Sequence, residues 1–214
     1  MISEKLFQFV DAEHATSLQR ELSTRVKSID DPDFQPRFFC GMDVAYDGGT
    51  AFVAAAVMDA GSIKIVETRT IVDNVSTRYV SGFLGFREGP PLVRITEKLR
   101  SRPDVFFIDG QGVAHPRKFG LACHVGLALD KPTIGVAKSR LYGKSHQSKI
   151  LGLGGEEIGR ILTTGNRKFY VSVGHRISLE TASHLVHKSI VNGHPSPLRE
   201  AHLESIRLKQ GGPN

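Results

Sequence analysis

The residues most able to do chemistry are acids that follow or interrupt apolar segments. Asp109 ends the apolar run 105–108, whose aromatic and β-branched residues are typical of a strand buried on both faces. A glycine-rich turn and His115 come next, and ligands in open α/β sheets bind beyond the carboxyl ends of strands. A lone aspartate there is more often a turn former or a cap. Asp109 and His115 are therefore candidates that need support from elsewhere in the chain.

A second acid, Asp43, lies in a segment with strand periodicity. Between residues 37 and 46, bulky apolar side chains alternate with a set that includes Gly41, Asp43 and Ala45. The predicted strand has one apolar face and one face on which small residues surround a carboxylate. Because a charge removed from water must be neutralised or paired, Asp43 needs a partner.

Glu88 is the third candidate and lies in the segment 78–91, which is dense in aromatic residues, glycines and arginines. That composition favours an ordered surface loop, the kind of segment that carries function. Pro90 and Pro91 suit the first positions of a helix, which places Glu88 just before the helix N-terminus. A simple capping role for Glu88 is an equal alternative.

The elements that must position these acids follow from the apolar periodicity. Three consecutive strands, a helix, a strand, a helix and a strand describe an α/β fold with a central mixed five-stranded sheet flanked by helices, which resembles the ribonuclease H architecture. The first and fourth strands are neighbours in that order, so Asp43 and Asp109 should face one another with Glu88 within reach. The five strands are expected at 37–46, 51–58, 63–72, 105–108 and 131–137, with a small additional hairpin at 158–162 and 169–173.

Acids that converge in this way predict a metal site. Two or three carboxylates at one point cannot all stay ionised without a cation. Hard oxygen ligands with room for water suit Mg²⁺ or Mn²⁺. Such a cation polarises a scissile phosphate, lowers the pKa of an attacking water and stabilises the departing oxygen.

Composition sets the remaining limits. The 214 residues, 40% of them hydrophobic, can bury a core in one domain spanning 1–214, with a frayed tail from about residue 209. An amphipathic helix is expected at 12–28 with Gln19 on its polar face. The 28 Lys and Arg against 22 Asp and Glu favour a polyanionic partner, although a solvated basic face is also common.

The cysteine count and the longest apolar run bear on location. Cys40 and Cys123 lie among apolar neighbours without zinc-ligand spacing, which favours a reduced compartment. The first 15 residues lack the pattern of a secretory signal, and no apolar run is long enough to cross a membrane. We expect a cytoplasmic protein that does not associate with a membrane.

Six motifs together resemble the endonuclease V family. They are Gly-Met-Asp-Val-Ala-Tyr at 41–46, Phe-Arg-Glu-Gly-Pro at 86–90, Asp-Gly-Gln-Gly at 109–112, His-Pro-Arg-Lys-Phe-Gly-Leu-Ala at 115–122, Gly-Val-Ala-Lys-Ser at 135–139 and Gly-His-Arg-Ile-Ser-Leu at 174–179. The resemblance extends from about residue 15 to about residue 207, and the motifs in this order are highly specific.

The resemblance implies a Mg²⁺-dependent DNA-repair nuclease with a ribonuclease H-like fold. Its substrates would be deaminated purines, above all hypoxanthine in deoxyinosine, in double- or single-stranded DNA, with inosine-containing RNA as a further candidate. The cut would fall at the second phosphodiester bond on the 3′ side and leave 3′-hydroxyl and 5′-phosphate ends. A monomer is expected.

The resemblance also assigns roles by position. Asp43, Glu88 and Asp109 match the family's metal-binding acids, and Lys138 matches the lysine near the scissile phosphate. A flipped base needs a tight pocket that bonds its Watson–Crick edge. The positions that match this pocket, built largely from main-chain groups, are Gly82, Leu84, Gly110 and Gly120, with His115 at the lesion and phosphate site.

Two further matches are weaker. Arg-Glu-Ala-His at 199–202 resembles a late Arg-x-Ala-Asp/His segment, which implies that His202 supplies or supports a metal ligand. A solvated helix histidine is nearly as good an interpretation. The strand-separating wedge often reads Pro-Tyr-Ile-Pro in the family, whereas residues 78–81 read Arg-Tyr-Val-Ser. Tyr79 keeps the aromatic ring, but the two stiffening prolines are missing.

Two other functions compete with this one. Another ribonuclease H-like nuclease, such as a resolvase or a ribonuclease H, would use the same acids, but the Tyr79 loop and the glycine-rich pocket favour a lesion reader. A catalytically silent nucleic-acid-binding module is the alternative from a different class. The three acids count against it, because binding alone favours Lys or Arg at such positions.

Overall fold

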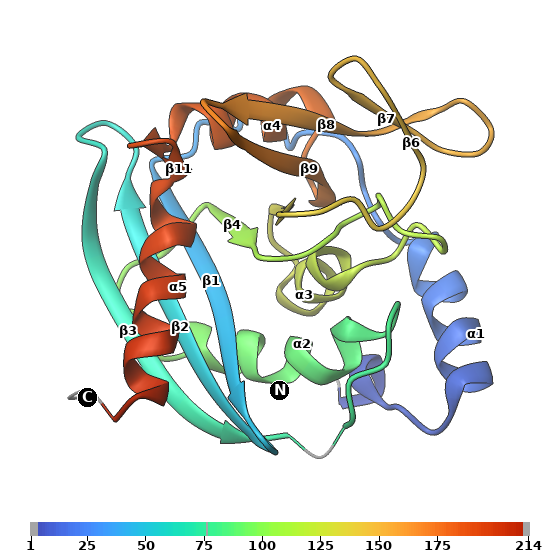
Figure 1. Ribbon diagram of the computed structural model, residues 1–214, viewed down its shortest axis with the longest axis horizontal. Helices are drawn as coiled ribbons and strands as arrows, with labels where there is room; N and C mark the ends of the chain where they lie inside the picture. The colour runs from blue at the N-terminus through green and yellow to red at the C-terminus, as the bar shows by residue number, and fades with distance from the viewer. Residues whose placement is uncertain (1–3, 76, 212–214) are drawn as a thin grey trace.

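The structure, a computed structural model, describes residues 4–75 and 77–211. Its main sheet has nine strands in the order β3-β2-β1-β4-β5-β9-β8-β7-β6 (Figure 1). Strand β1 is parallel to β4 and β4 is parallel to β5, whereas the other neighbours are antiparallel. The strands are β1 (Phe38–Asp47), β2 (Thr50–Asp59), β3 (Lys64–Asn74), β4 (Val105–Ile108), β5 (Thr133–Ala137), β6 (Lys144–His146), β7 (Lys149–Leu151), β8 (Glu157–Thr164) and β9 (Arg167–His175).

Helices cover both faces of this sheet. Helices α2 and α3 pack against each other on one face, whereas α5 runs along β1 and β2 on the other (Figure 1). A two-residue-per-strand hairpin, β10 (Ile190–Val191) with β11 (His194–Pro195), leads into α5. The helices are η1 (Glu4–Phe7, a 3-10 turn), α1 (Ala12–Ser23), α2 (Leu84–Thr96), α3 (Leu121–Leu129), α4 (Leu179–Lys188) and α5 (Ser196–Lys209).

The five central strands confirm the predicted ribonuclease H-like arrangement. The sheet is larger than the five strands expected, because the additional hairpin is not separate. Strand β9 pairs antiparallel with β5, with Val173 opposite Ile134, and β8, β7 and β6 follow. This pairing covers the hydrogen-bonding edge that β5 would otherwise expose. The short strands β6 and β7 were not expected from a segment rich in glycine and lysine.

Helix α2 begins earlier than its prolines indicate. The expected start was at Pro90 and Pro91, but the helix begins at Leu84 and contains both prolines. A proline has a helical φ but removes one backbone hydrogen bond, and the packing of α2 against α3 offsets that loss. Glu88 therefore lies inside the helix, and Phe83 is the N-cap. The expected positions of Glu88, before the helix or capping it, are both wrong.

Strand β1 has the two different faces that its sequence predicts. Met42 belongs to the apolar cluster beneath α2, and Phe39 belongs to the cluster on the opposite face. Side chains alternate between the two faces of a strand, so Asp43 lies on the same face of β1 as Phe39, and this face is the one toward α5. Gly41 permits this approach, because a Cβ there would lie 2.2 Å from the backbone carbon of Pro197 at the start of α5.

Three smaller predictions concern the cysteines, the C-terminal tail and membrane-spanning segments. Cys40 and Cys123 are both buried and unbridged, as expected. Helix α5 ends at Lys209, and the remainder of the expected tail, residues 212–214, lies outside the described residues. No helix in the described part of the chain is long and apolar enough to cross a membrane.

Candidate active site

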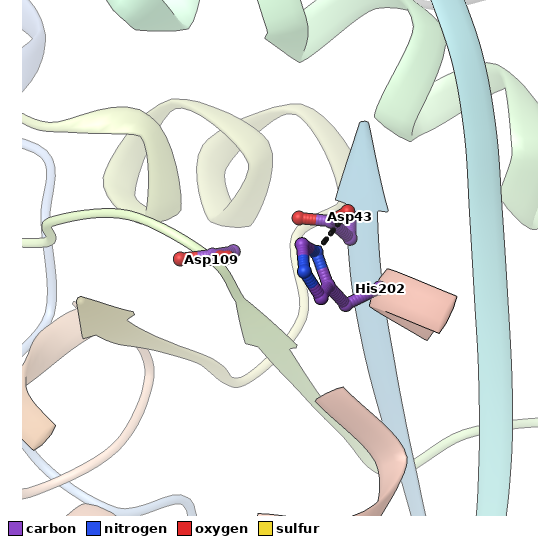
Figure 2. Close-up of side chains that lie close together, drawn as sticks. All are labelled: Asp43, Asp109 and His202. Atoms are coloured by element: carbon purple, nitrogen blue, oxygen red, sulfur yellow. Dashed lines mark hydrogen bonds and ion pairs between the residues drawn. The ribbon is translucent and has the colours of Figure 1, made fainter. Parts of the chain in front are cut away.

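Two acids meet where the parallel strands β1 and β4 end their pairing. Met42 and Ile108 are the last paired residues of the two strands, and Asp43 and Asp109 are the residues that follow them. His202 approaches from α5 on the same side (Figure 2). One ligand atom from each of Asp43, Asp109 and His202 lies within 4.8 Å of the others. The fold therefore brings together two of the three predicted acids and the predicted histidine.

The carboxylate of Asp43 is held by helix α5. Its Oδ2 accepts a hydrogen bond from Ser205 Oγ at 2.7 Å and lies 3.2 Å from His202 Nδ1. Asp43 is only 8% exposed. Ser205 was not found from the sequence, although its spacing of three residues from His202 places both on one helix face. The two contacts on one oxygen orient the Asp43 carboxylate.

Asp109 is neutralised by a lysine from the neighbouring strand. Lys138 follows β5, and its Nζ lies 2.7 Å from Asp109 Oδ2. Burial raises the pKa of Asp109, the nearby Lys138 ammonium opposes that rise, and the Asp43 charge adds to it. The Lys138 ammonium therefore favours the ionised form of Asp109.

Glu88 reaches the same region from the second turn of α2. Burial raises its pKa to about 8, and the charges of Asp43 and Asp109 contribute to the rise, whereas Arg87 opposes it. Its oxygens are not among the three ligand atoms within 4.8 Å. Glu88 thus shares the electrostatic environment of the two aspartates.

This donor set fits a divalent cation. Carboxylate oxygens are the ligands that Mg²⁺ and Mn²⁺ prefer. Burial raises the pKa of Glu88 and of Asp109, and neighbouring carboxylate charges add to both rises, so ionisation of one carboxyl opposes ionisation of the others. A cation at the cluster would remove that conflict.

A cavity of about 270 Å³ opens beside the acids and is also lined by Asp109 and Lys138. Its walls come from α1, α3, the start of α2 and the loops after β3, β4 and β5. All the residues that were expected to contact substrate line this one cavity: Tyr79, Gly82, Leu84, Gly110, His115 and Gly120.

The loop that carries Tyr79 is fastened at Gly82. The Gly82 carbonyl oxygen accepts hydrogen bonds from Gln19 Nε2 at 3.1 Å, His115 Nε2 at 3.0 Å and Arg117 at 2.7 Å. Gly82 has φ of +81°, a left-handed conformation that favours glycine. Tyr79 itself is 67% exposed at the cavity rim. The loop is therefore anchored at its base and open at its tip.

His115 takes part in this anchor as a neutral side chain. It is 2% exposed, and burial together with the Arg117 charge lowers its pKa to about 4. Its Nδ1 accepts a hydrogen bond from the Arg117 backbone N–H at 3.2 Å, so its Nε2 carries the proton donated to Gly82. Both ring nitrogens are occupied within the protein.

Gln19 is a residue whose burial the helical pattern of the sequence does not predict. It was expected on the polar face of α1 but is 1% exposed, so that expectation is wrong. Its amide donates to the carbonyls of Gly82 and Phe119 and accepts from Arg117 Nε at 2.5 Å. These partners satisfy a buried amide but come from distant segments that no local pattern reveals.

Comparison with known proteins gives a consistent result. The Endonuclease V family model matches residues 20–203. Endonuclease V of Kosmotoga olearia is 36% identical, with 94% of this chain and 93% of the relative covered. A crystal structure of Endonuclease V from Bacillus subtilis is 30% identical, with a TM-score of 0.86 over 96% of this chain and 94% of that one.

A further solved structure includes nucleic acid. It is Endonuclease V of Ciona intestinalis in complex with a 24-mer DNA that contains an inosine followed by a ribo-adenosine. That protein is 26% identical, with a TM-score of 0.86 and coverage of 93% of this chain and 97% of that one. Because the family match includes every candidate site residue from Asp43 to His202, the chain belongs to the endonuclease V family.

Proposed function

We propose that this endonuclease V binds deoxyinosine in the cavity beside Tyr79 and hydrolyses the second phosphodiester bond on the 3′ side. The products would carry 3′-hydroxyl and 5′-phosphate ends. The observation that carries the proposal is that Asp109 of the acid cluster and its ion-pair partner Lys138 both line the cavity of about 270 Å³. The Ciona intestinalis relative in complex with inosine-containing DNA supports the choice of lesion.

Recognition would take place on main-chain groups. Gly82, Gly110 and Gly120 line the cavity, and residues without a Cβ let a base approach the backbone closely. His115 supports this wall from behind by holding the Gly82 carbonyl. Tyr79 at the rim can fill the gap left when the base leaves the stack.

The acids would hold the metal that the family uses. We assign Asp43, Asp109 and Glu88 as ligands of Mg²⁺, for which Mn²⁺ can substitute, with His202 as a further ligand or as a support for Asp43. Such a cation supplies Lewis-acid activation of the phosphate and of the attacking water.

Lys138 would have a different task from the acids. Its ammonium nitrogen lies 2.7 Å from Asp109 Oδ2 and its side chain is 59% exposed, so the ammonium group can turn toward a phosphate oxygen that enters the site. A lysine is a point charge that suits phosphate. In this position it would offset the negative charge that develops as the bond breaks.

Three properties stay predictions. Inosine-containing RNA is a candidate substrate in addition to DNA. The cytoplasm is the expected location, and a monomer of one domain is the expected form. Each is independent of the chemistry assigned to the acids.

The proposal is tested with end-labelled duplexes that are identical except for one deoxyinosine in place of deoxyguanosine. With Mg²⁺, we expect a single nick at the second bond on the 3′ side of deoxyinosine and no nick in the control duplex. The product should be sealed by a DNA ligase, because ligation requires 3′-hydroxyl and 5′-phosphate ends. Equal nicking of both duplexes, or a nick at another bond, would contradict the assignment.

A further inference from the structure

A second cavity adjoins the acids, on the side where α5 lies. It measures about 200 Å³ and shares Asp109 and Lys138 with the cavity assigned to the base. His202 of α5 lines it as well. A strand whose base enters the first cavity and whose phosphate lies at Asp109 can thus continue into the second.

A third cavity of about 380 Å³ adjoins this one, and the two share His194 and Arg199 as lining residues. Arg167, at the start of β9, lines the far part. We call these two adjoining cavities the α5 groove. It leads away from the acids along the start of α5 and the β10–β11 hairpin.

The α5 groove has a positive character that the protein does not neutralise itself. Arg167 and Arg199 are exposed, and within the described residues neither is ion-paired with a carboxylate. Burial lowers the pKa of His194, and the charges of Arg167, Arg199 and Lys138 lower it further. The positive charges of Arg167, Arg199 and Lys138 therefore all act at the position of His194. Within residues 4–75 and 77–211, Glu200 is the single acid that lines the far part.

The hairpin at this groove is held in place. Thr164 of β8 donates a hydrogen bond from Oγ1 to the Gly193 carbonyl at 2.9 Å. Asn192 and Gly193 both have positive φ, as a tight hairpin turn requires. The His194 ring lies edge-on to Phe169, with 6.2 Å between centroids. The imidazole therefore packs against Phe169 and lines both cavities of the groove.

We propose that Arg167, His194 and Arg199 form a binding subsite for the phosphates of the strand on the 3′ side of the cut. The inference rests on the proposed function, because the direction of the strand follows from a lesion in the first cavity and a cut on its 3′ side. Arginine suits phosphate because its planar guanidinium can donate two hydrogen bonds at once.

The test compares two single-stranded 12-mers of equal charge, each with one deoxyinosine, bound without divalent metal. One has two nucleotides on the 3′ side of the lesion and the other has eight. We expect wild type to bind the long 3′ flank more tightly. The double variant Arg167→Gln, Arg199→Gln should lose this preference and bind the short flank within about twofold of wild type. Its salt slope on the long flank should fall by about 1.4, since each single-strand phosphate contributes about 0.7.

Two controls isolate the subsite. Arg100→Gln with Arg102→Gln removes the same charge just before β4, at the opposite end of that strand from Asp109, and should keep the wild-type preference. Glu200→Gln removes the opposing charge and should strengthen binding of the long flank. With Mg²⁺, the arginine double variant should raise KM on the long-flank substrate and leave kcat unchanged.

The outcomes separate this inference from the proposed function. Failure of wild type to prefer deoxyinosine over deoxyguanosine would contradict the proposed function itself. If that preference holds but the arginine variant keeps the full gain from the long flank, the subsite is wrong. The same conclusion follows if wild type gains nothing from the longer 3′ flank.

Discussion

Ser205 and His202 contact the same oxygen of Asp43, so the carboxylate is oriented before substrate arrives. Partners that orient a metal ligand in this way commonly contribute 10- to 100-fold to metal affinity or activity. Asp109 has a different kind of support, a lysine that neutralises it. The two aspartates are therefore distinguished by their neighbours, although both come directly after the last paired residues of β1 and β4.

Removal of the Ser205 hydroxyl should weaken catalysis without removing it. We expect Ser205→Ala to lower the Mg²⁺-dependent nicking rate by about tenfold or more and to require more Mg²⁺ for half-maximal rate. Ser205→Thr, which keeps a hydroxyl, should recover most of the rate. A Mg²⁺ titration of the nicking rate checks this. An unchanged titration for Ser205→Ala would mean that the hydrogen bond does not tune the metal site.

His124 provides a pH test away from the acids. It is fully buried, its Nε2 is bonded to the Leu6 carbonyl, and it contacts the rings of Phe7, Phe86 and Phe119. Burial lowers its pKa to about 4, whereas an unfolded histidine titrates near 6.5. Between these values the unfolded chain binds a proton that the native protein does not, so this residue lowers stability as pH falls from about 6.5 to 4.

His124→Phe removes that proton and keeps a ring in the apolar site. From pH 7 to pH 4, the free energy of unfolding should therefore fall by about 1–3 kcal/mol less in the variant than in wild type. Urea unfolding of both proteins across this range measures the difference. Parallel pH profiles would show that the pKa of His124 is the same in the native and unfolded states.

At the scale of the elements, the sequence predicts strands β1 and β4 better than it predicts the start of helix α2. The strands β1 and β4 were predicted because their patterns are local, and their parallel pairing places Asp43 beside Asp109. The start of α2 was missed because packing against α3 outweighs two prolines. Gln19 was missed because the groups that satisfy its amide lie on segments far away in the chain. Non-local contacts account for each of these differences.

Tyr79 belongs to an element anchored at Gly82 and exposed at its tip. Stacking of a base on an aromatic ring contributes about 1–3 kcal/mol. Tyr79→Ala should therefore weaken binding of inosine DNA by about one to two factors of ten. Val80→Ala, the adjacent exposed position, should change it little. Equal affinities of Tyr79→Ala and wild type at one salt concentration would exclude the wedge role.

At the scale of the whole molecule, the formal net charge of +6 explains DNA binding only when the cations that are free to contact phosphates are identified. Several cations near the acids are already used within the protein. Lys118 is paired with Glu156, Lys138 with Asp109, and Arg117 is bonded to Gly82. Arg167 and Arg199 of the α5 groove, by contrast, have no carboxylate partner among the described residues. The sequence predicts the net charge but not this distribution, which depends on tertiary pairing.

Binding of undamaged duplex should weaken steeply with salt. Each phosphate that the protein neutralises contributes about −0.9 to the slope of log affinity against log salt. Four or five contacts would give a slope near −4. Fluorescence anisotropy between low and moderate salt measures it. A slope close to zero would show that the cations of the α5 groove do not bind DNA phosphates.

The central claim is that Asp43 and Asp109 hold the metal that cuts the strand. Its most direct test is the Mg²⁺-dependent nicking rate of a duplex with one deoxyinosine, measured for wild type, Asp43→Ala and Asp109→Ala. Asp47→Ala, an exposed acid on the same strand as Asp43, is the matched control. We expect the first two variants to lose at least about 10²–10³ in rate, as when one transition-state stabiliser is removed, while still binding the lesion. The control should nick at the wild-type rate. Nicking by Asp43→Ala or Asp109→Ala at near the wild-type rate would contradict the claim.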